Sequence, residues 1–277
     1  MTTTQILRVM SCEDAGVARA VARELTTITR AVDAIVHAIQ SGGRLIYVGA
    51  GTSGRLASLD SLECPPTFGV PRTQVQAVMA GGRRALTSAV EGAEDSPARG
   101  AKDLAAKNIT ARDIVVGIAA SGTTPYVLGA LKHALKQRAA TIAITSNRRS
   151  PLARLARIII APATGPEAIS GSTRLKAGTA QKMVLNMLST AAMVRLGHVY
   201  DNWMIGVALT NQKLRQRGLR ILASASGASV SRAEHVLRQS GYNLRTGLVM
   251  LKTRCDAASA RKRLTLAKNN LRRALRE

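Results

Sequence analysis

The chain has 277 residues, which is long enough for one large α/β domain with a small appendage. Hydrophobic residues make up 46% of it and aromatic residues only 2%, so any core must be built from aliphatic side chains. Its three cysteines lie far apart, no run approaches the ~20 apolar residues of a membrane span, and no signal peptide opens the chain. These features disfavour disulfide-rich, metal-cluster and membrane-spanning proteins and favour the cytoplasm.

The formal net charge of +24 predicts an anionic partner. Acidic residues are sparse after Asp113, so the C-terminal half carries most of the imbalance. We favour an anionic small-molecule substrate over nucleic acid. The chain has one Phe and one Trp for stacking on bases and shows no nucleic-acid-binding motif. Nucleic-acid binding is kept as the weaker alternative.

The first predicted elements lead to a glycine-rich turn. Hydrophobic residues at three- and four-residue spacing predict a helix over residues 15–39, and the apolar run at 44–48 predicts a buried strand. The strand is followed by Gly-Thr-Ser-Gly at residues 51–54 and then by a helix. Such a turn places backbone N–H groups where they bind an oxyanion. We therefore expect a phosphate site at this turn.

The helix that follows the turn is expected to end just after Glu63, because Pro65 and Pro66 cannot extend it. A strand over 73–79 and a helical piece over 84–90 come next.

Three acids then fall within five residues: Glu91, Glu94 and Asp95. On a helix, Glu91 and Asp95 would share a face. In so basic a chain their mutual repulsion suggests a functional role, and a solvated loop or helix end is the alternative.

A second strand and Ser/Thr turn follow the same pattern. The strand covers residues 113–118, the turn includes Ser121 and Gly122, and a helix covers 126–136. The hydroxyls of this turn are expected to bind phosphate oxygens. The alternative is that Ser121 and Thr124 only cap the helix.

Two more strands, over residues 141–145 and 158–160, complete the alternation of strands with helices. This alternation predicts an α/β fold with a doubly wound parallel sheet. In that architecture the ligand binds at the carboxyl ends of the strands, which is where both Ser/Thr turns lie.

The segment 165–182 reads GPEAISGSTRLKAGTAQK and brings hydroxyls and cations to the start of a helix over 181–196. These groups suit an anion, and an ordinary capped helix with exposed bases is the alternative. Further helices are expected over residues 200–217, 231–239, 244–252 and 257–276. We predict a main domain over 1–222 and a small helical region over 223–277.

Six sequence motifs together resemble those of a known protein family. They are VGAGTSGRL, ECPPTFG, EGAED, GIAASGTTPYV, GPEAISGSTRLKAGTAQK and NQKL, in this order. Together they resemble the N-acetylmuramic acid 6-phosphate etherase family over nearly the whole chain, and more loosely the glucokinase regulatory protein. The long fifth motif is the most specific of them.

The resemblance implies a sugar isomerase (SIS) domain, a doubly wound α/β sandwich that binds phosphosugars, followed by a small helical C-terminal region. It implies a homodimer without metal or redox cofactor. It also implies a lyase that cleaves the D-lactyl ether of N-acetylmuramate 6-phosphate, by elimination and then hydration, in cytoplasmic recycling of cell-wall sugars. A sugar-phosphate sensor without chemistry and a phosphosugar isomerase are the competing hypotheses.

The resemblance also assigns residues. Glu63 matches the family's proton donor and Glu94 its other catalytic residue, although the two roles remain interchangeable. Thr123 stands where family members usually carry Arg. The residues expected to bind substrate are Gly51, Thr52, Ser53, Gly54, Ser121, Gly122, Glu167, Ser172 and Lys176.

Overall fold

The computed structural model describes residues 1–209 and 211–276, and these divide into two compact units. Unit 1 comprises Met1–Leu62 and Arg72–Ala191, and unit 2 comprises Glu63–Pro71 and Ala192–Glu277. The domain division at residue 222 stays a prediction. Among the described residues, no helix is both long enough and apolar enough to cross a bilayer.

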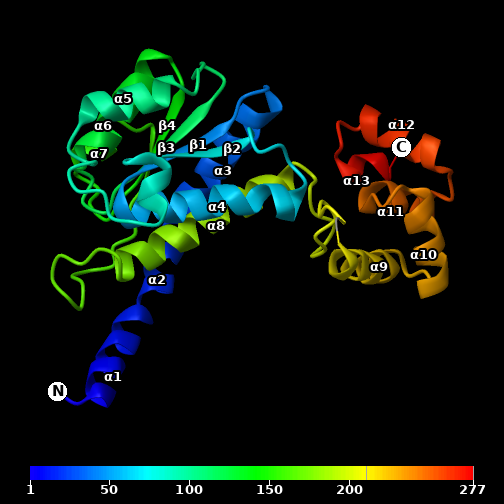
Figure 1. Cartoon of the computed structure of the whole chain (residues 1–277), viewed down its shortest axis with the longest axis horizontal. Helices are drawn as coiled ribbons and strands as arrows, with labels where there is room; N and C mark the ends of the chain where they lie inside the picture. The colour runs from blue at the N-terminus through cyan, green and yellow to red at the C-terminus, as the bar shows by residue number, and fades with distance from the viewer. Residues whose placement is uncertain (210, 277) are drawn as a thin grey trace. The chain divides into compact units, whose positions relative to one another are not determined.

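Unit 1 is built on a five-stranded sheet in the order β2-β1-β3-β4-β5, with every pair parallel. The strands are β1 (Leu45–Gly49), β2 (Val75–Met79), β3 (Ile114–Ile118), β4 (Ala140–Ile144) and β5 (Ile158–Ile160). The residues of β1 and β3 are buried throughout, as continuous apolar runs in a parallel sheet should be. The predicted α/β fold with a parallel sheet is confirmed (Figure 1).

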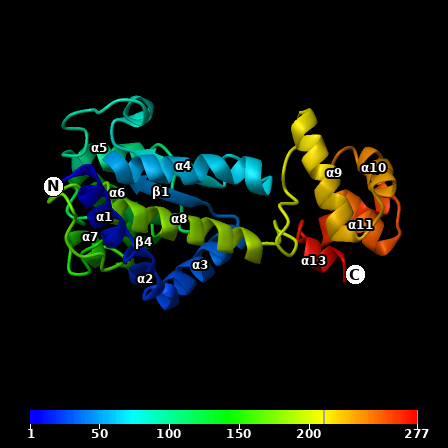
Figure 2. The same ribbon diagram turned by 90° about the horizontal axis from the view of Figure 1, so that it is seen from below.

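Helices cover both faces of this sheet. One face packs against α5 (Pro97–Ala105), α6 (Pro125–Lys136) and α7 (Pro151–Arg154) through a cluster that includes Ile46 and Val48. The alternate residues of β1 point to the other face, where α3 (Leu25–Gln40), α4 (Gly51–Phe68) and α8 (Lys176–Arg195) lie. Figure 2 shows α4 and α8 running side by side.

The N-terminal region departs from the prediction. The single helix expected over 15–39 is two helices, α2 (Val17–Ala22) and α3, and a further helix, α1 (Thr3–Asp14), precedes them. The break falls at Glu24, a buried residue whose carboxylate accepts a hydrogen bond from Arg148, 2.5 Å away. Glu24 is the N-cap of α3, and local periodicity does not reveal its long-range ion pair.

The expected end of α4 after Glu63 is wrong. The helix continues through Pro65 and Pro66 to Phe68. Each proline removes one N–H donor, but its fixed φ is compatible with a helix. The N–H of Gly69 closes the last turn by donating to the carbonyl of Pro65, at 2.9 Å.

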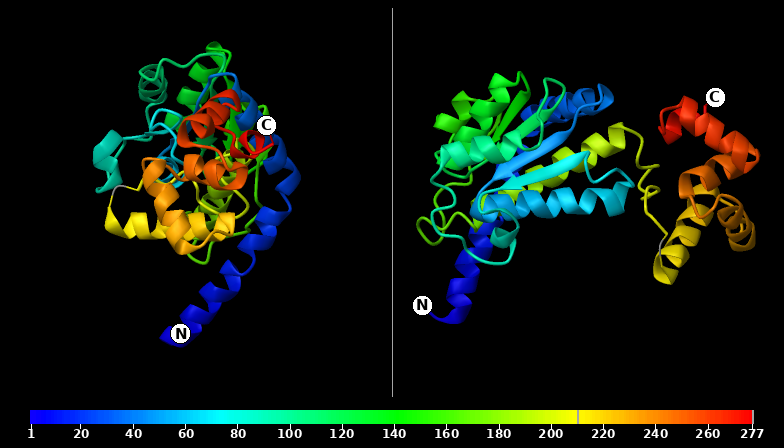
Figure 3. Two further views of the ribbon diagram at one scale, coloured as in Figure 1. Left: turned by 90° about the vertical axis from the view of Figure 1, so that its right-hand side faces the viewer. Right: turned by 45° about the horizontal axis from the view of Figure 1, so that its top comes forward.

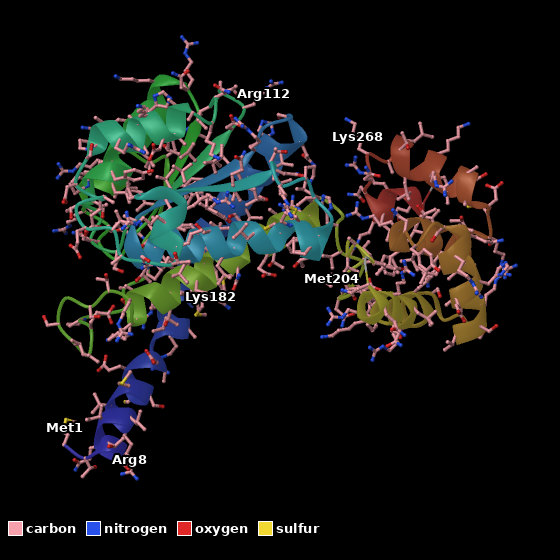
Figure 4. The ribbon with its side chains drawn as sticks, viewed as in Figure 1. Met1, Arg8, Arg112, Lys182, Met204 and Lys268 are labelled. Carbon is pink, nitrogen blue, oxygen red and sulfur yellow. The ribbon has the colours of Figure 1, made fainter. Side chains whose placement is uncertain are left out.

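Three further expectations are corrected. The piece expected over 84–90 is a short 3₁₀ helix, η1 (Gly82–Leu86), and residues 91–95 form turns, so their acids do not share a helix face. The helix expected over 200–217 begins only at Gln212, and Tyr200 and Trp203 form an isolated bridge. The helix expected over 257–276 is interrupted at residues 267–270, where Lys268 (labelled in Figure 4) and Asn269 have positive φ.

Unit 2 is helical beyond the end of α4. Its helices are α9 (Gln212–Ser226), α10 (Val230–Gln239), α11 (Leu244–Thr253), α12 (Ala257–Leu266) and α13 (Leu271–Ala274). They enclose an aliphatic core, with Leu222, Leu248 and Leu271 nearly or fully buried, and Trp203 packs against it. The predicted helical C-terminal region is confirmed (Figure 3).

A polar contact in unit 2 joins Arg245, His198 and the backbone of Phe68. Arg245 Nη2 lies 2.7 Å from both the Phe68 carbonyl oxygen and His198 Nδ1. His198 Nδ1 also lies 3.1 Å from the same carbonyl oxygen, so this nitrogen faces both a donor and an acceptor, and its role depends on the tautomer. Burial, together with the charge of Arg245, lowers the pKa of His198 to about 4.

This lowered pKa predicts a pH-dependent stability. Between pH 6.5 and about 4 the unfolded chain binds a proton at His198 and the folded chain does not, so stability falls as the pH falls through this range. The expected loss is about 3 kcal/mol. Urea denaturation followed by Trp203 fluorescence should show it, and His198→Asn should flatten this pH dependence. An equally steep dependence in the variant would contradict the assignment.

Candidate functional site

The two predicted Ser/Thr turns leave the same edge of the sheet. β1 ends at Gly49 and β3 at Ile118, and these two residues are paired in register. The turn that begins α4 follows Gly49, and the turn before α6 follows Ile118. The sheet therefore brings both turns to neighbouring positions at the carboxyl ends of its central strands, where α/β folds bind ligands.

The first turn is packed too closely for larger side chains. A Cβ on Gly54 would lie 2.9 Å from the carbonyl oxygen of Gly49 and 2.7 Å from Met79. Gly51 adopts a φ of +53°, which favours glycine. Ser53 is buried and donates its hydroxyl to Gln181 Oε1, at 2.8 Å. The turn is thus fixed to α8, with backbone N–H groups of the first turn of α4 available to an anion.

The second turn is fixed by its own hydroxyls. Ser121 Oγ and Thr123 Oγ1 are 2.9 Å apart, and the N–H of Thr123 donates to Ser121 Oγ. A Cβ on Gly122 would lie 2.1 Å from Ser150 Oγ, and its φ is +70°. Ser121 and Thr123 are exposed, whereas Thr124 makes no side-chain cap to α6. Helix capping by Thr124 is therefore not the reason for this hydroxyl-rich turn.

The start of α8 forms the third part of the site. Glu167 accepts hydrogen bonds from the N–H groups of Lys176 and Ala177, at 2.9 and 3.0 Å, and so caps the helix. The ammonium of Lys176 is buried and paired with Glu13. Thr52 lies against Gly178, so the starts of α4 and α8 are adjacent. Substrate contacts by Glu167, Lys176 and the half-buried Ser172 stay predictions.

The two predicted catalytic carboxyls are both exposed. Glu63 lies on α4, eleven residues after Thr52, which is about three helical turns, so the two residues share a face of the helix. Glu94 lies in the turn 91–95, where its backbone carbonyl accepts a hydrogen bond from the N–H of Tyr126 at the start of α6, at 2.9 Å. Exposure leaves both carboxyls accessible to a ligand.

Sequence reasoning missed Asp60, a carboxylate of α4 that is only 6% exposed. Its oxygens accept hydrogen bonds from Tyr47 of β1 and from Asn186 and Ser189 of α8, each at 3.0 Å. Burial raises the pKa of Asp60, and the three hydrogen bonds and the charge of Lys182 (Figure 4) oppose that rise. Asp60 therefore joins α4, the sheet and α8.

Replacing Asp60 by alanine is expected to lower the free energy of unfolding by about 2–5 kcal/mol, because two buried donors and one half-buried donor lose their acceptor. Asp60→Asn keeps the volume and one carbonyl oxygen, so its loss should be about 1 kcal/mol. Urea denaturation followed by circular dichroism compares the two variants. Equal losses in both would show that the hydrogen bonds are not the cause.

Comparisons with known proteins match this chain to SIS-domain folds. The glucokinase regulatory protein N-terminal SIS domain family matches residues 27–135, and the SIS domain family matches residues 87–191. Solved phosphoheptose isomerases from Neisseria gonorrhoeae and Francisella tularensis align with a TM-score of 0.54 each, at 16% and 20% identity. They cover 69% and 70% of this chain, and 98% and 100% of their own. At that identity the likeness concerns the fold.

Sequence relatives are far closer. The N-acetylmuramic acid 6-phosphate etherase of Salmonella dublin is 50% identical over 273 residues, covering 99% of this chain and 92% of its own. The etherases of Geobacillus thermodenitrificans and Serratia proteamaculans are 49% and 51% identical over 275 residues, covering 99% of this chain and 93% of theirs.

Proposed function

Because the chain belongs to the N-acetylmuramic acid 6-phosphate etherase family, we propose that it cleaves the D-lactyl ether of N-acetylmuramate 6-phosphate. An etherase of this kind is a carbon–oxygen lyase. The products would be N-acetylglucosamine 6-phosphate and D-lactate, and the setting would be cytoplasmic recycling of cell-wall sugars. The observation that carries the proposal is identity near 50% over 99% of the chain.

The phosphate of the sugar would bind at the two Ser/Thr turns. Backbone N–H groups at the start of α4 and the exposed hydroxyls of Ser121 and Thr123 are suitable donors for its oxygens. The dipoles of α4 and α6 favour the same negative charge. Fixing one end of the substrate orients its reacting carbons and lowers the entropic part of the barrier.

The reaction needs one base and one acid. In the open-chain sugar the C1 aldehyde acidifies the hydrogen on C2. A base removes that proton, the bond between C3 and the ether oxygen breaks, and an acid protonates the departing oxygen of lactate. Water then adds its oxygen to C3 of the resulting double bond, and a proton returns to C2. Two carboxyl groups are sufficient for these steps.

We assign the role of general acid to Glu63 and the role of general base to Glu94. The reverse assignment is the alternative. Thr52 and Glu63 are separated by about 16 Å along α4. The phosphorus and the ether oxygen of an extended open-chain sugar are roughly 7 Å apart, because six bonds of about 1.5 Å join them. The rest of the roughly 16 Å is covered in two ways. Hydrogen bonds add about 3 Å at each end of the substrate, and the glutamate side chain is directed toward the helix N-terminus.

The proposal includes a homodimer and no metal or redox cofactor. Leu59 and Leu62, on the exposed side of α4 near Glu63, are 53% and 65% exposed, and a second copy would shield such side chains. Analytical ultracentrifugation should give twice the chain mass of 29.2 kDa. A single species at the chain mass would exclude the dimer.

Isotopes test the mechanism separately from the identity of the substrate. In heavy-oxygen water, the new oxygen should appear on C3 of the sugar and not in lactate. In deuterated water, the sugar product should carry deuterium at C2. Label in lactate, or product without deuterium at C2, would contradict elimination followed by hydration.

A further inference from the structure

The last turns of α4, which carry Glu63, lack part of the usual helical hydrogen bonding. Pro65 and Pro66 have no N–H, so the carbonyls of Ser61 and Leu62 receive no helical hydrogen bond. The segment Glu63–Pro71 is grouped with the C-terminal helices in unit 2. The segment therefore packs with those helices.

Arg245 of α11 makes the main polar contact with this segment. Its Nη2 donates to the carbonyl oxygen of Phe68, the last residue of α4, at 2.7 Å. The final carbonyls of a helix lack helical partners and lie at the negative end of its dipole, so a guanidinium fits there. His198 Nδ1 lies 2.7 Å from the same nitrogen and 3.1 Å from the Phe68 carbonyl oxygen, so all three groups form one polar contact.

Backbone packing leaves this segment little freedom. A Cβ on Gly69 would lie 2.3 Å from the carbonyl oxygen of Gly206, and a Cβ on Gly206 would lie 2.1 Å from that of Phe68. The chain at Gly206 thus runs directly against the end of α4. The position of α4's last turn is determined by two elements of unit 2, α11 and the segment around Gly206.

Considered by itself, the placement of the Arg245 guanidinium lowers the stability of the fold. No carboxylate pairs with this guanidinium in residues 1–209 and 211–276, and its Nε is buried without a hydrogen-bond partner. Burial lowers the pKa of Arg245. Arg245 is half-buried, and withdrawing a cation from water without a carboxylate partner costs free energy. Natural proteins keep such departures mainly at functional sites.

We propose that Arg245 is a positioning residue for Glu63: its hydrogen bond to the Phe68 carbonyl fixes the last turns of α4 and thereby the direction of the Glu63 carboxyl. This inference rests on the proposed function of Glu63.

Three variants test the proposal. Arg245→Met removes the donors, and Arg245→Lys keeps one. Arg261→Met is the matched control, because Arg261 is exposed and lines the same hollow of about 760 Å³ as Arg245, whereas the side chains that contact the Phe68 carbonyl oxygen in the described residues are His198 and Arg245. For each, kcat and KM for D-lactate release are measured, together with amide hydrogen exchange over residues 61–70. Trp203 fluorescence and circular dichroism show whether the variant is folded.

We expect Arg245→Met to lower kcat by about 10²-fold, since a displacement of about 1 Å has such an effect, and to change KM less than about twofold. Exchange over residues 61–70 should accelerate. Arg245→Lys should recover most of kcat, and Arg261→Met should match the wild type. Adding Arg245→Met to Glu63→Gln should lower kcat no further, because both changes act through one carboxyl.

Two results would overturn the role of Arg245 and leave the proposed function standing. One is an unchanged kcat in a folded Arg245→Met chain, and the other is an additive loss of kcat in the chain that carries both Arg245→Met and Glu63→Gln. If Arg245→Met does not fold, the Arg245→Lys chain decides, because unaltered exchange and kcat there would also overturn it. Full activity of Glu63→Gln would instead remove the role of Glu63, and a wild-type chain without lactate release would remove the proposed function. Either outcome removes the basis of the inference as well.

Discussion

Glu63→Gln and Glu94→Gln are each expected to lower kcat for D-lactate release by about 10²–10⁴-fold, the usual contribution of a positioned general acid or base. Glutamine keeps the size and hydrogen-bonding capacity of each side chain and removes the proton transfer. Both side chains are exposed and make no contact on which the fold depends, so the variants should fold normally. Loss of activity can then be attributed to chemistry.

Glu91→Gln is the matched control for Glu94, because it removes a carboxylate from the same exposed turn. Its kcat should stay within about twofold of the wild type. Near-wild-type turnover in a folded Glu63→Gln or Glu94→Gln chain would end the assignment of that residue. A loss of equal size in Glu91→Gln would point to the charge of the turn and away from a specific base.

The second large effect is expected on stability, at Asp113. This carboxylate is 2% exposed and accepts from the backbone N–H, Nε and Nη2 of Arg44, at 2.9, 3.0 and 2.8 Å, and from the N–H of Thr110 at 2.8 Å. It joins the starts of β1 and β3. Asp113→Ala should lower the free energy of unfolding by about 3–5 kcal/mol, because it leaves a guanidinium and two amides without their acceptor.

The pKa of Asp113 adds a pH dependence. Burial alone would raise this pKa, but hydrogen bonds from Arg44 and Thr110 outweigh burial and lower it. Stability from the lowered pKa is therefore present above the unfolded value of 3.8 and is lost as the pH falls through the folded value. Urea denaturation at pH 7 measures the variant's loss, and a loss below about 1 kcal/mol would contradict the account.

The parts of the fold that local sequence determines were predictable. The apolar runs of β1 and β3 are buried on both faces, and each is followed by a Gly/Ser/Thr turn. Their pairing then places both turns at one edge of the sheet without further information. The same reasoning does not reach the break at Glu24, because Arg148, its partner, lies 124 residues away.

The continuation of α4 through Pro65 and Pro66 shows the opposite case. A local rule predicted an end, but the helix continues for one more turn, and its end contacts Gly206 and Arg245. Residues 200–209 were also expected to be helical. Their apolar side chains belong to the core of unit 2, but their backbone does not form a helix.

Asp60 could have been found from the sequence, although its partners could not. Ser53, Ala57, Asp60 and Cys64 follow the four- and three-residue spacing of a buried helix stripe, and all four are buried. An acid within such a stripe requires donors from elsewhere in the fold. Those donors, Asn186 and Ser189, are more than a hundred residues away, so only the structure identifies them.

The most direct test is to incubate the purified chain with N-acetylmuramate 6-phosphate and to measure D-lactate and the sugar product. We expect D-lactate and N-acetylglucosamine 6-phosphate in equal amounts, and no lactate from N-acetylmuramate without the phosphate. Binding of the substrate without lactate release would indicate a sensor. Interconversion of aldose and ketose phosphates without lactate would indicate an isomerase, and either result would contradict the etherase.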